Sequence, residues 1–335
     1  MQYIILDSKN AITTSGEILS DPRSDGSARP WVAYKLNALQ LSSIFRDLGK
    51  DSRSSRVHEC GTFLNFLECS VDSSHPKRLS RANFCRDRLC PTCGWRRSLL
   101  LSHTVYKVAH YVSQDRFTRF LLLTLTVKNC LGDVLSTTLD KMFKAFSALT
   151  HKKKGLFTGA VHGWFRSLEV TYNAESGTFH PHFHVLLAVG SDYFKGKYIK
   201  QSAIVDAWAH ALDIDYTPVV DIRTVQSKDG TVSGLQSVAA EVAKYAVKPM
   251  LDKLSHDTLL ETIGTLSSAL HGRRLVAFGG TLKDANKLLK CADVDSDSVD
   301  LVAVGDDEES TCHCSVCQSD LHDHLYMWVG KNYVG

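Results

Sequence analysis

The sequence predicts an α+β fold in which an antiparallel sheet is layered with helices. Predicted strands and helices alternate along most of the chain. One pair of strands has the pattern of an antiparallel hairpin, because residues 164–172 and 179–189 each alternate in polarity and a turn sequence at 173–177 joins them. A chain that combines a hairpin with intervening helices favours an antiparallel sheet over an all-parallel one.

The other elements follow from local patterns. The short apolar run Phe-Leu-Leu-Leu-Thr-Leu-Thr-Val predicts a strand over 118–127, since it has β-branched residues at one end. A second strand is predicted over 219–225. Apolar residues at helical spacing predict helices over 99–112, 134–149, 202–212, 235–248 and 258–270.

The composition is that of a folded protein. The chain has 335 residues, of which 44% are hydrophobic and 22% charged, which excludes a disordered chain, a collagen-like fibre and a coiled coil. Its longest apolar stretch, Phe120 to Val127, is far shorter than the ~20 residues of a spanning helix. Asp7 and Lys9 lie where the apolar segment of a secretory signal peptide would be, so we expect a cytoplasmic protein.

Charge is unevenly distributed along the chain. The formal net charge is +3, yet the stretch 291–310 holds eight acidic residues and no Lys or Arg, a composition that predicts a linker. Between Lys77 and Arg119, ten basic residues accompany only Asp87 and Asp115. Such a basic region suits a polyanion such as nucleic acid, with a solvated basic face as the alternative.

Three histidines on the second hairpin strand predict a metal site. His180, His182 and His184 point to one face of the strand, because side chains alternate faces, and Phe183 points to the other. If the turn is centred between 175 and 176, Glu169 lies opposite His182 and its carboxylate shares that face. Ordinary hydrogen-bonded histidines are the alternative.

One helix carries a set of residues suited to nucleophilic chemistry. Glu241, Tyr245 and Lys248 are spaced i, i+4 and i+7, so they share a helix face. Many surface helices carry the same three residue types, and this pattern alone does not indicate catalysis.

Ten cysteines in a chain expected to be cytoplasmic indicate metal binding or chemistry before disulfides. The run Cys85-x4-Cys90-Pro-x-Cys93 has the form of a zinc knuckle. Cys60 is our choice for the fourth ligand, with Cys69 in reserve. Buried free thiols are the alternative.

A second group of soft ligands lies near the C-terminus. It could form another small zinc site, or belong to a disordered and reactive tail. Its members are Cys312, Cys314, Cys317, His322 and His324.

Taken together, these motifs resemble the rolling-circle replication initiators of small bacterial plasmids, which belong to the HUH endonuclease superfamily. Three motifs occur in the family's order: the strand at 120–127, the metal motif His-Pro-His-Phe-His-Val-Leu-Leu at 180–187, and the catalytic helix Glu-Val-Ala-Lys-Tyr at 241–245. The run at 84–96 is similar to the family's cysteine motif. The resemblance extends from about residue 56 to about residue 289.

The resemblance implies a mechanism. An initiator of this kind binds the origin and nicks one strand, with Tyr245 forming a 5′-phosphotyrosine and leaving a 3′-OH primer. Lys244 or Lys248 would favour the phenolate of Tyr245. Glu241 would activate a water or a second attacking group at termination, when the strand is rejoined.

The resemblance also implies cofactors. A catalytic Mn²⁺ or Mg²⁺ would be held by His182 and His184, with Glu169 or His180 as further ligands. Zn²⁺ would have a structural role at Cys60, Cys85, Cys90 and Cys93.

The fold implied is a central antiparallel sheet of about five strands with flanking helices, to which a cysteine-rich zinc-binding element is added. The expected organisation has five parts: an N-terminal segment of unassigned role (1–50), a basic zinc element with a helix (51–115), the nicking and joining domain (116–290), an acidic linker (291–310) and a Cys/His-rich tail (311–335).

The implied partners are single-stranded and supercoiled origin DNA, together with the host helicase and DNA polymerase. The zinc element and its basic surroundings would grip DNA near the nick. The basic residues expected there are Arg86, Arg88, Arg96 and Arg97.

Two other functions fit parts of the sequence. One is an HUH-type transposase or relaxase, which the pairing of Glu241 with Tyr245 and the cysteine motif make less favoured. The other is a zinc-dependent DNA-binding regulator without catalysis, which has no use for an open metal site beside a tyrosine.

Overall fold

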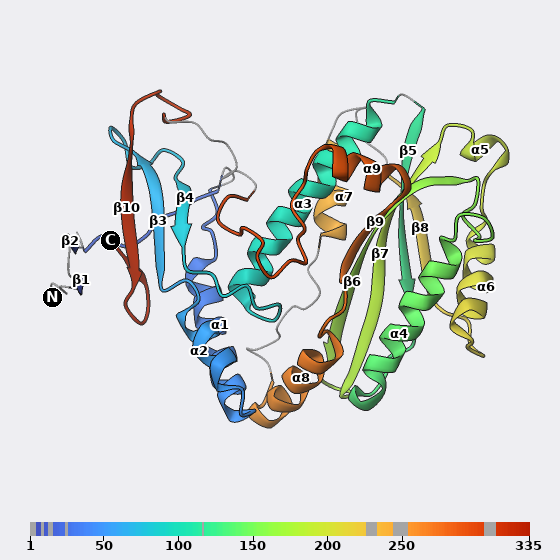
Figure 1. Ribbon diagram of the computed structural model, residues 1–335, viewed down its shortest axis with the longest axis horizontal. Helices are drawn as coiled ribbons and strands as arrows, with labels where there is room; N and C mark the ends of the chain where they lie inside the picture. Colours follow the sequence, from blue (N-terminus) through green and yellow to red (C-terminus); the bar gives the residue numbers. More distant parts are fainter. Residues whose placement is uncertain are drawn as a thin grey trace. The chain divides into compact units, whose positions relative to one another are not determined.

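The structure is a computed structural model, and it describes residues 5–7, 10–12, 16–23, 26–115, 117–225, 233–243, 254–304 and 313–335. The chain divides into two compact units (Figure 1). The first comprises Met1–Arg96 and Asp300–Gly335, and the second comprises Arg97–Val299. Helix α3 (Pro91–Ser113) begins in the first unit and continues into the second.

The second unit contains an antiparallel five-stranded sheet in the order β8-β5-β7-β6-β9. The expected sheet of about five strands is confirmed, with the predicted hairpin β6–β7 at its centre. Strand β9 was not predicted, because its four residues are too few to show a period. The strands are β5 (Thr118–Thr126), β6 (Val161–Asn173), β7 (Thr178–Gly190), β8 (Val220–Thr224) and β9 (Val276–Gly279).

One face of this sheet is largely apolar and is covered by helices. Phe183 of β7 is fully buried, with its ring centroid 5.4 Å from that of Phe143, 5.7 Å from that of Phe146 and 6.2 Å from that of Trp208. Phe143 and Phe146 come from α4 (Gly132–Leu149) and Trp208 from α6 (Gln201–Leu212). The alternation of β7 therefore directs its apolar residues into this core.

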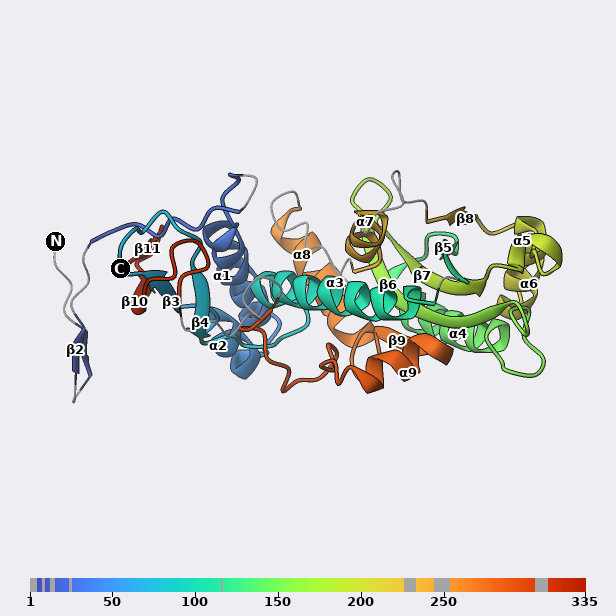
Figure 2. The same ribbon diagram turned by 90° about the horizontal axis from the view of Figure 1, so that it is seen from above.

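The opposite face carries polar side chains and helix α7 (Ser233–Val242), which Figure 2 shows across β6 and β7 from α4. Helix α7 matches the first part of the helix predicted over 235–248, and residues 244–248 of that prediction lie outside the described ranges. The remaining helices of this unit are α5 (Tyr193–Gly196), α8 (His256–Ala269) and α9 (Gly280–Leu288). No helix within the described ranges is long and apolar enough to cross a membrane.

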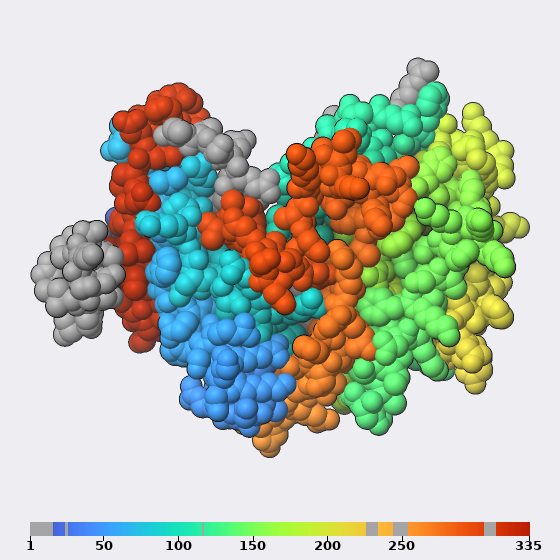
Figure 3. All heavy atoms as spheres, in the orientation of Figure 1, coloured from blue at the N-terminus to red at the C-terminus, as the bar shows by residue number. Residues whose placement is uncertain are grey.

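The first unit contains a four-stranded antiparallel sheet in the order β11-β10-β3-β4, which was not predicted. It joins the N-terminal strands β3 (Phe63–Cys69) and β4 (Arg78–Ala82) to the C-terminal strands β10 (Leu321–Trp328) and β11 (Tyr333–Val334). Figure 3 shows the red C-terminal segment against the blue and cyan N-terminal one.

Two helices complete the core of the first unit, α1 (Trp31–Asp47) and α2 (Asp51–Glu59). Trp31 of α1 is buried, and its ring meets those of Phe66 and Trp95 edge-on at 6.1 Å and 4.7 Å. A separate short ribbon pairs β1 (Ile5–Asp7) with β2 (Asn10–Ile12).

Candidate functional site

The turn of the central hairpin sets the register of the candidate site. The side-chain oxygen of Asn173 accepts hydrogen bonds from the backbone N–H groups of Glu175 (2.9 Å) and Ser176 (3.1 Å). Gly177 then adopts φ +63°, which only glycine occupies without strain. Strand pairing from this turn places Glu169 opposite His182, so the predicted register is confirmed.

The register gathers three ionisable side chains around one point. Nε2 of His182 lies 3.2 Å from Oε2 of Glu169, and Nε2 of His184 lies 3.0 Å from the same oxygen. Glu169 and His184 are only 5% and 6% exposed, so this contact is shielded from bulk water. The potential ligand atoms of the three residues all lie within 4.8 Å of one another.

The outer nitrogen of His182 indicates why a cation suits this point. Nδ1 of His182 lies 3.3 Å from the backbone carbonyl of His180, an acceptor to which it can only donate. A neutral ring that donates from Nδ1 presents the lone pair of Nε2 to the Glu169 carboxylate. That pairing is repulsive unless a proton or a metal ion lies between the two atoms.

The electrostatics of Glu169 support the same conclusion. Burial by itself raises the pKa of the Glu169 carboxyl. The hydrogen bonds from His182 and His184 and the charge of the two rings lower that pKa, and together they outweigh the effect of burial. The net result is a pKa well below the usual value. Glu169 is therefore an anion in a dry position, facing two nitrogen ligands.

The spacing of these atoms fits a divalent cation. Adjacent ligands of an octahedral ion with bonds of about 2.1 Å are about 3 Å apart, which matches the two contacts of Glu169. His180 does not join this group, although its ring centroid lies 5.2 Å from that of His182. Of the four predicted metal ligands, the structure brings together Glu169, His182 and His184.

Helix α7 is anchored on the same face of the sheet. The hydroxyl of Ser167 donates to the backbone carbonyl of Val242 at 2.6 Å, which satisfies one of the exposed carbonyls at the end of α7. Ser167 is opposite His184 and two residues before Glu169, so it shares their face. Glu241 lies half-buried in this last turn, whereas Lys244, Tyr245 and Lys248 lie outside the described residues.

Four cysteines form a compact cage in the first unit. The sulfur atoms of Cys60 and Cys93, of Cys85 and Cys93, and of Cys90 and Cys60 are each 3.6 Å apart. Sulfur ligands of a tetrahedral zinc ion lie about 3.8 Å apart for bonds of about 2.3 Å. The structure thus brings together the four residues predicted as structural zinc ligands, with Cys60 rather than Cys69 as the fourth.

Two backbone N–H groups point at sulfur atoms of this cage. The N–H of Cys85 points to Cys60 Sγ at 3.4 Å, and that of Arg86 points to Cys93 Sγ at 3.2 Å. Burial raises the pKa of the Cys93 thiol well above its usual value, and the neighbouring thiols raise it further. Four such sulfurs can be thiolates together only around a cation.

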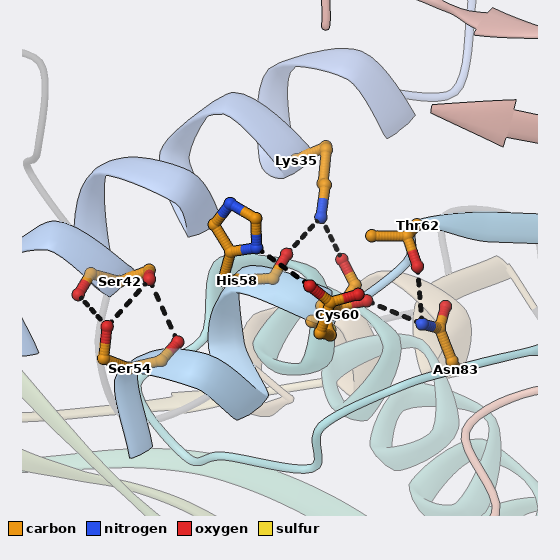
Figure 4. A network of polar contacts seen from close by, with 8 residues as sticks. Lys35, Ser42, Ser54, His58, Cys60, Thr62 and Asn83 are labelled. Carbon is orange, nitrogen blue, oxygen red and sulfur yellow. Dashed lines mark hydrogen bonds and ion pairs between the residues drawn. The ribbon is translucent and has the colours of Figure 1, made fainter. Parts of the chain in front are cut away.

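A buried lysine lies beside the cage. The ammonium of Lys35 donates to the carbonyls of His58 at 2.6 Å and Cys60 at 2.8 Å (Figure 4). Burial lowers the pKa of Lys35, while the cysteine thiolates and Glu59 act in the opposite direction. Because zinc with four thiolates keeps a net negative charge, Lys35 is well placed to offset it.

Two of the arginines predicted to bind DNA are buried instead. Arg96 is fully buried and donates to the carbonyls of Leu301 (2.8 Å) and Val302 (2.6 Å). Arg97 is also fully buried and donates to the carbonyl of Ser296 at 3.3 Å. Neither guanidinium is accessible to a DNA phosphate, so the prediction that Arg96 and Arg97 bind DNA was wrong. Of the other two predicted arginines, Arg86 is exposed and Arg88 is partly exposed.

The C-terminal Cys/His residues do not form the single group that the sequence suggested. Cys314 and Cys317 lie with Cys69 and His75, whereas His322 and His324 lie with Glu68. Cys312 lies outside the described residues. The sequence analysis missed His75 and Glu68, because neither belongs to a motif and both depend on the pairing of β10 with β3.

Comparison with known proteins identifies relatives over most of the chain. The model of a family described as Replication protein matches residues 76–333. A "Protein rep" of Streptococcus pneumoniae is 36% identical over 88% of this chain and 89% of its own length. A "Protein rep" of Lentilactobacillus hilgardii is 38% identical over 88% of this chain and 92% of its own length.

A third "Protein rep", from Bacillus amyloliquefaciens, is 34% identical over 87% of this chain and 91% of its own length. No solved structure matches the chain. The family match continues to residue 333, so the expectation that the resemblance ends near residue 289 was wrong.

We expect Glu169→Gln to weaken Mn²⁺ binding at least about tenfold, because the amide removes the negative charge while keeping the shape of the side chain. Titration calorimetry of the purified protein with Mn²⁺ measures the change. Glu175→Gln, in the exposed turn of the same hairpin, is the matched control and should bind as the parent does. Equal affinities for all three proteins would remove Glu169 from the ligand set.

We expect Cys90→Ser to abolish tight zinc binding at the four-cysteine cage and to lower the melting temperature, because zinc at a structural site contributes folding free energy. Metal analysis after dialysis against a mild chelator measures the zinc content. Cys130→Ser, which alters a cysteine outside the four groups, is the control. A parent protein without zinc would contradict the assignment.

Proposed function

The chain belongs to the replication protein family of plasmid Rep proteins, and we propose that it initiates rolling-circle replication by nicking one strand of origin DNA. In this proposal residues 116–290 form an HUH-type nicking and joining domain. The single observation that carries the proposal is the convergence of His182 and His184 on one oxygen of Glu169.

The proposed reaction is a transesterification. The hydroxyl oxygen of Tyr245 forms a bond to the scissile phosphorus, and the bond from phosphorus to the 3′ oxygen breaks. The phenolic proton is lost and the 3′ oxygen gains a proton, so a 5′-phosphotyrosine and a 3′-OH primer result. The bond energy stays in the protein–DNA link, and rejoining therefore needs no ATP.

The donor set supports a hard divalent cation in this reaction. Glu169, His182 and His184 would hold Mn²⁺ or Mg²⁺, since carboxylate oxygens with imidazoles suit these ions. Such a cation supplies positive charge next to the phosphate oxygens in the transition state. His180 has a different role in this proposal: its backbone carbonyl accepts a hydrogen bond from Nδ1 of His182 and so orients the ring of that ligand.

The anchoring of α7 supports Tyr245 as the nucleophile. Tyr245 follows Val242 by three residues, a separation of at most about 11 Å along an extended chain. Val242 is held by Ser167 on the face that carries the two histidines. Lys244 and Lys248 would lower the pKa of the phenol by their charge.

Glu241 suits a second step of the same reaction. It lies in the last described turn of α7, one helical turn before Tyr245 in sequence. We assign it the activation of a water or of a second attacking hydroxyl when replication terminates. This role requires no contact between Glu241 and the cation.

The four-cysteine element is proposed to hold structural Zn²⁺ and to contact origin DNA. Arg86 and Arg88, in the segment between two of its cysteines, are the side chains we assign to phosphate contacts. The substrates are single-stranded and supercoiled origin DNA, with the host helicase and polymerase acting on the nicked product. The names of the relatives favour a replication initiator over a transposase or a relaxase.

We expect Tyr245→Phe to lose nicking by roughly 10³-fold or more, because the substitution removes only the attacking oxygen. The assay is cleavage of single-stranded or supercoiled origin DNA with Mn²⁺, read on a denaturing gel. Tyr172→Phe, on the apolar face of the same hairpin, is the control. Nicking by Tyr245→Phe at the parent's rate would exclude Tyr245 as the nucleophile.

We expect Glu241→Ala to form the covalent protein–DNA adduct but to release it slowly, because only the second step needs this carboxylate. The adduct should accumulate over time on a denaturing protein gel with labelled DNA. Glu261→Ala, an exposed glutamate of α8, should behave as the parent. Clean termination by the Glu241 variant would refute this role.

A further inference from the structure

A group of three cysteines and one histidine lies at one end of the four-stranded sheet, apart from both sites described above. Cys69 is the last residue of β3, His75 follows in the connection to β4, and Cys314 and Cys317 precede β10. Their ligand atoms all lie within 4.8 Å of one another. We propose that these four residues bind a second zinc ion, which fastens the C-terminal strand to the N-terminal hairpin.

The distances within the group are those of a tetrahedral zinc site. Sγ of Cys69 lies 3.4 Å from Sγ of Cys317, and Nδ1 of His75 lies 3.4 Å from Sγ of Cys314 and 3.6 Å from Sγ of Cys317. Zinc bonds of about 2.3 Å to sulfur and about 2.05 Å to nitrogen separate such ligand pairs by about 3.5 to 3.8 Å. The cage therefore has the size that the ion requires.

The outer nitrogen of His75 has the partner expected of a metal ligand. Nε2 lies 3.6 Å from a carboxylate oxygen of Asp72, three residues earlier in the same turn. A histidine bound to zinc through one nitrogen commonly directs its other N–H to a carboxylate, which fixes the ring. The arrangement leaves Nδ1 to face the three sulfurs.

The turn before β10 is shaped around its two cysteines. The N–H of Val316 points to Cys314 Sγ at 3.4 Å, and the hydroxyl of Ser319 lies 3.2 Å from Cys317 Sγ. The N–H of Gln318 donates to the carbonyl of Cys314 at 2.9 Å, with Gln318 at φ +61°. The N–H of Val316 stabilises a thiolate at Cys314, and the Ser319 hydroxyl, which accepts from the Cys317 thiol, can donate to that sulfur once it has lost its proton.

His322 and His324 do not belong to this site but to a separate group around Glu68. The Glu68 carboxylate near them accepts hydrogen bonds from Lys77 at 2.8 Å and from the hydroxyl of Tyr326 at 2.9 Å. Nδ1 of His324 lies 3.1 Å from the other oxygen of Glu68. The carboxylate of Glu68 is therefore already balanced by the buried ammonium of Lys77, so it does not need a metal cation.

The position of the site gives it a structural role. Strand β10 pairs with β3 from Leu321 opposite Cys69 to Met327 opposite Phe63. Cys69 belongs to the first of these pairs, and the other three ligands lie in the segments beyond it. Cys69 and Cys317 are 248 residues apart in sequence. Because these ligands come together only in the folded chain, the binding free energy of a metal that links them adds to the stability of the fold.

The test is the zinc content of the full chain and its variants after dialysis against a mild chelator. We expect His75→Asn and Cys317→Ser each to lose one zinc equivalent relative to the parent, and Cys90→Ser to lose a different one. His75→Asn combined with Cys90→Ser should lose both. His322→Asn, which alters the exposed histidine of the rival group, should keep the parent's zinc content.

A measurement on the parent alone decides the matter if a variant fails to fold. Cys317 is exposed, so its free thiol reacts readily with an alkylating reagent. We expect peptide mapping to show Cys317 protected until a strong chelator is added. Equal reaction rates with and without the chelator, a reductant-sensitive link between Cys69 and Cys317, or full zinc content in His75→Asn would each overturn the proposal.

Discussion

The candidate catalytic site depends on the register of one hairpin. A shift of β7 by one residue relative to β6 would turn its histidines into the core and expose Phe183, because the faces of a strand alternate. Three aromatic rings of α4 and α6 hold Phe183 in place, and the turn at Asn173 and Gly177 fixes the loop length. The apolar core on one face thus positions Glu169, His182 and His184 on the other.

Most of this hairpin could be predicted because its determinants are local. The alternation, the turn at 174–177 and the pairing of Glu169 with His182 all fall within 30 residues of sequence. The four-stranded sheet could not be predicted in the same way. The segment Leu321–Trp328 alternates only weakly, and nothing within it identifies β3 as its partner. The ligand role inferred for His75 becomes visible only once that pairing is known.

The buried arginines show a second limit of sequence reasoning. Arg96 and Arg97 follow the cysteine motif in a basic region, which suggested DNA contacts. Their guanidinium groups instead donate to backbone carbonyls of residues 296–302, inside a stretch predicted as an acidic linker. The composition shows that this region is basic. It does not show whether a given guanidinium is exposed to solvent or is buried against backbone carbonyls, because that depends on tertiary packing.

The ligand chemistry separates two kinds of site in this chain. The groups in the first unit that resemble zinc sites are dominated by sulfur, with ligand atoms spaced for a tetrahedron. The group in the second unit has one carboxylate oxygen and two imidazoles at the shorter spacing of an octahedral ion. Thiolates select zinc, whereas oxygen with imidazole admits Mn²⁺ or Mg²⁺. If both kinds of site are filled as proposed, the sulfur cages would retain zinc while the ion at Glu169, His182 and His184 could exchange, since that group offers no soft ligand.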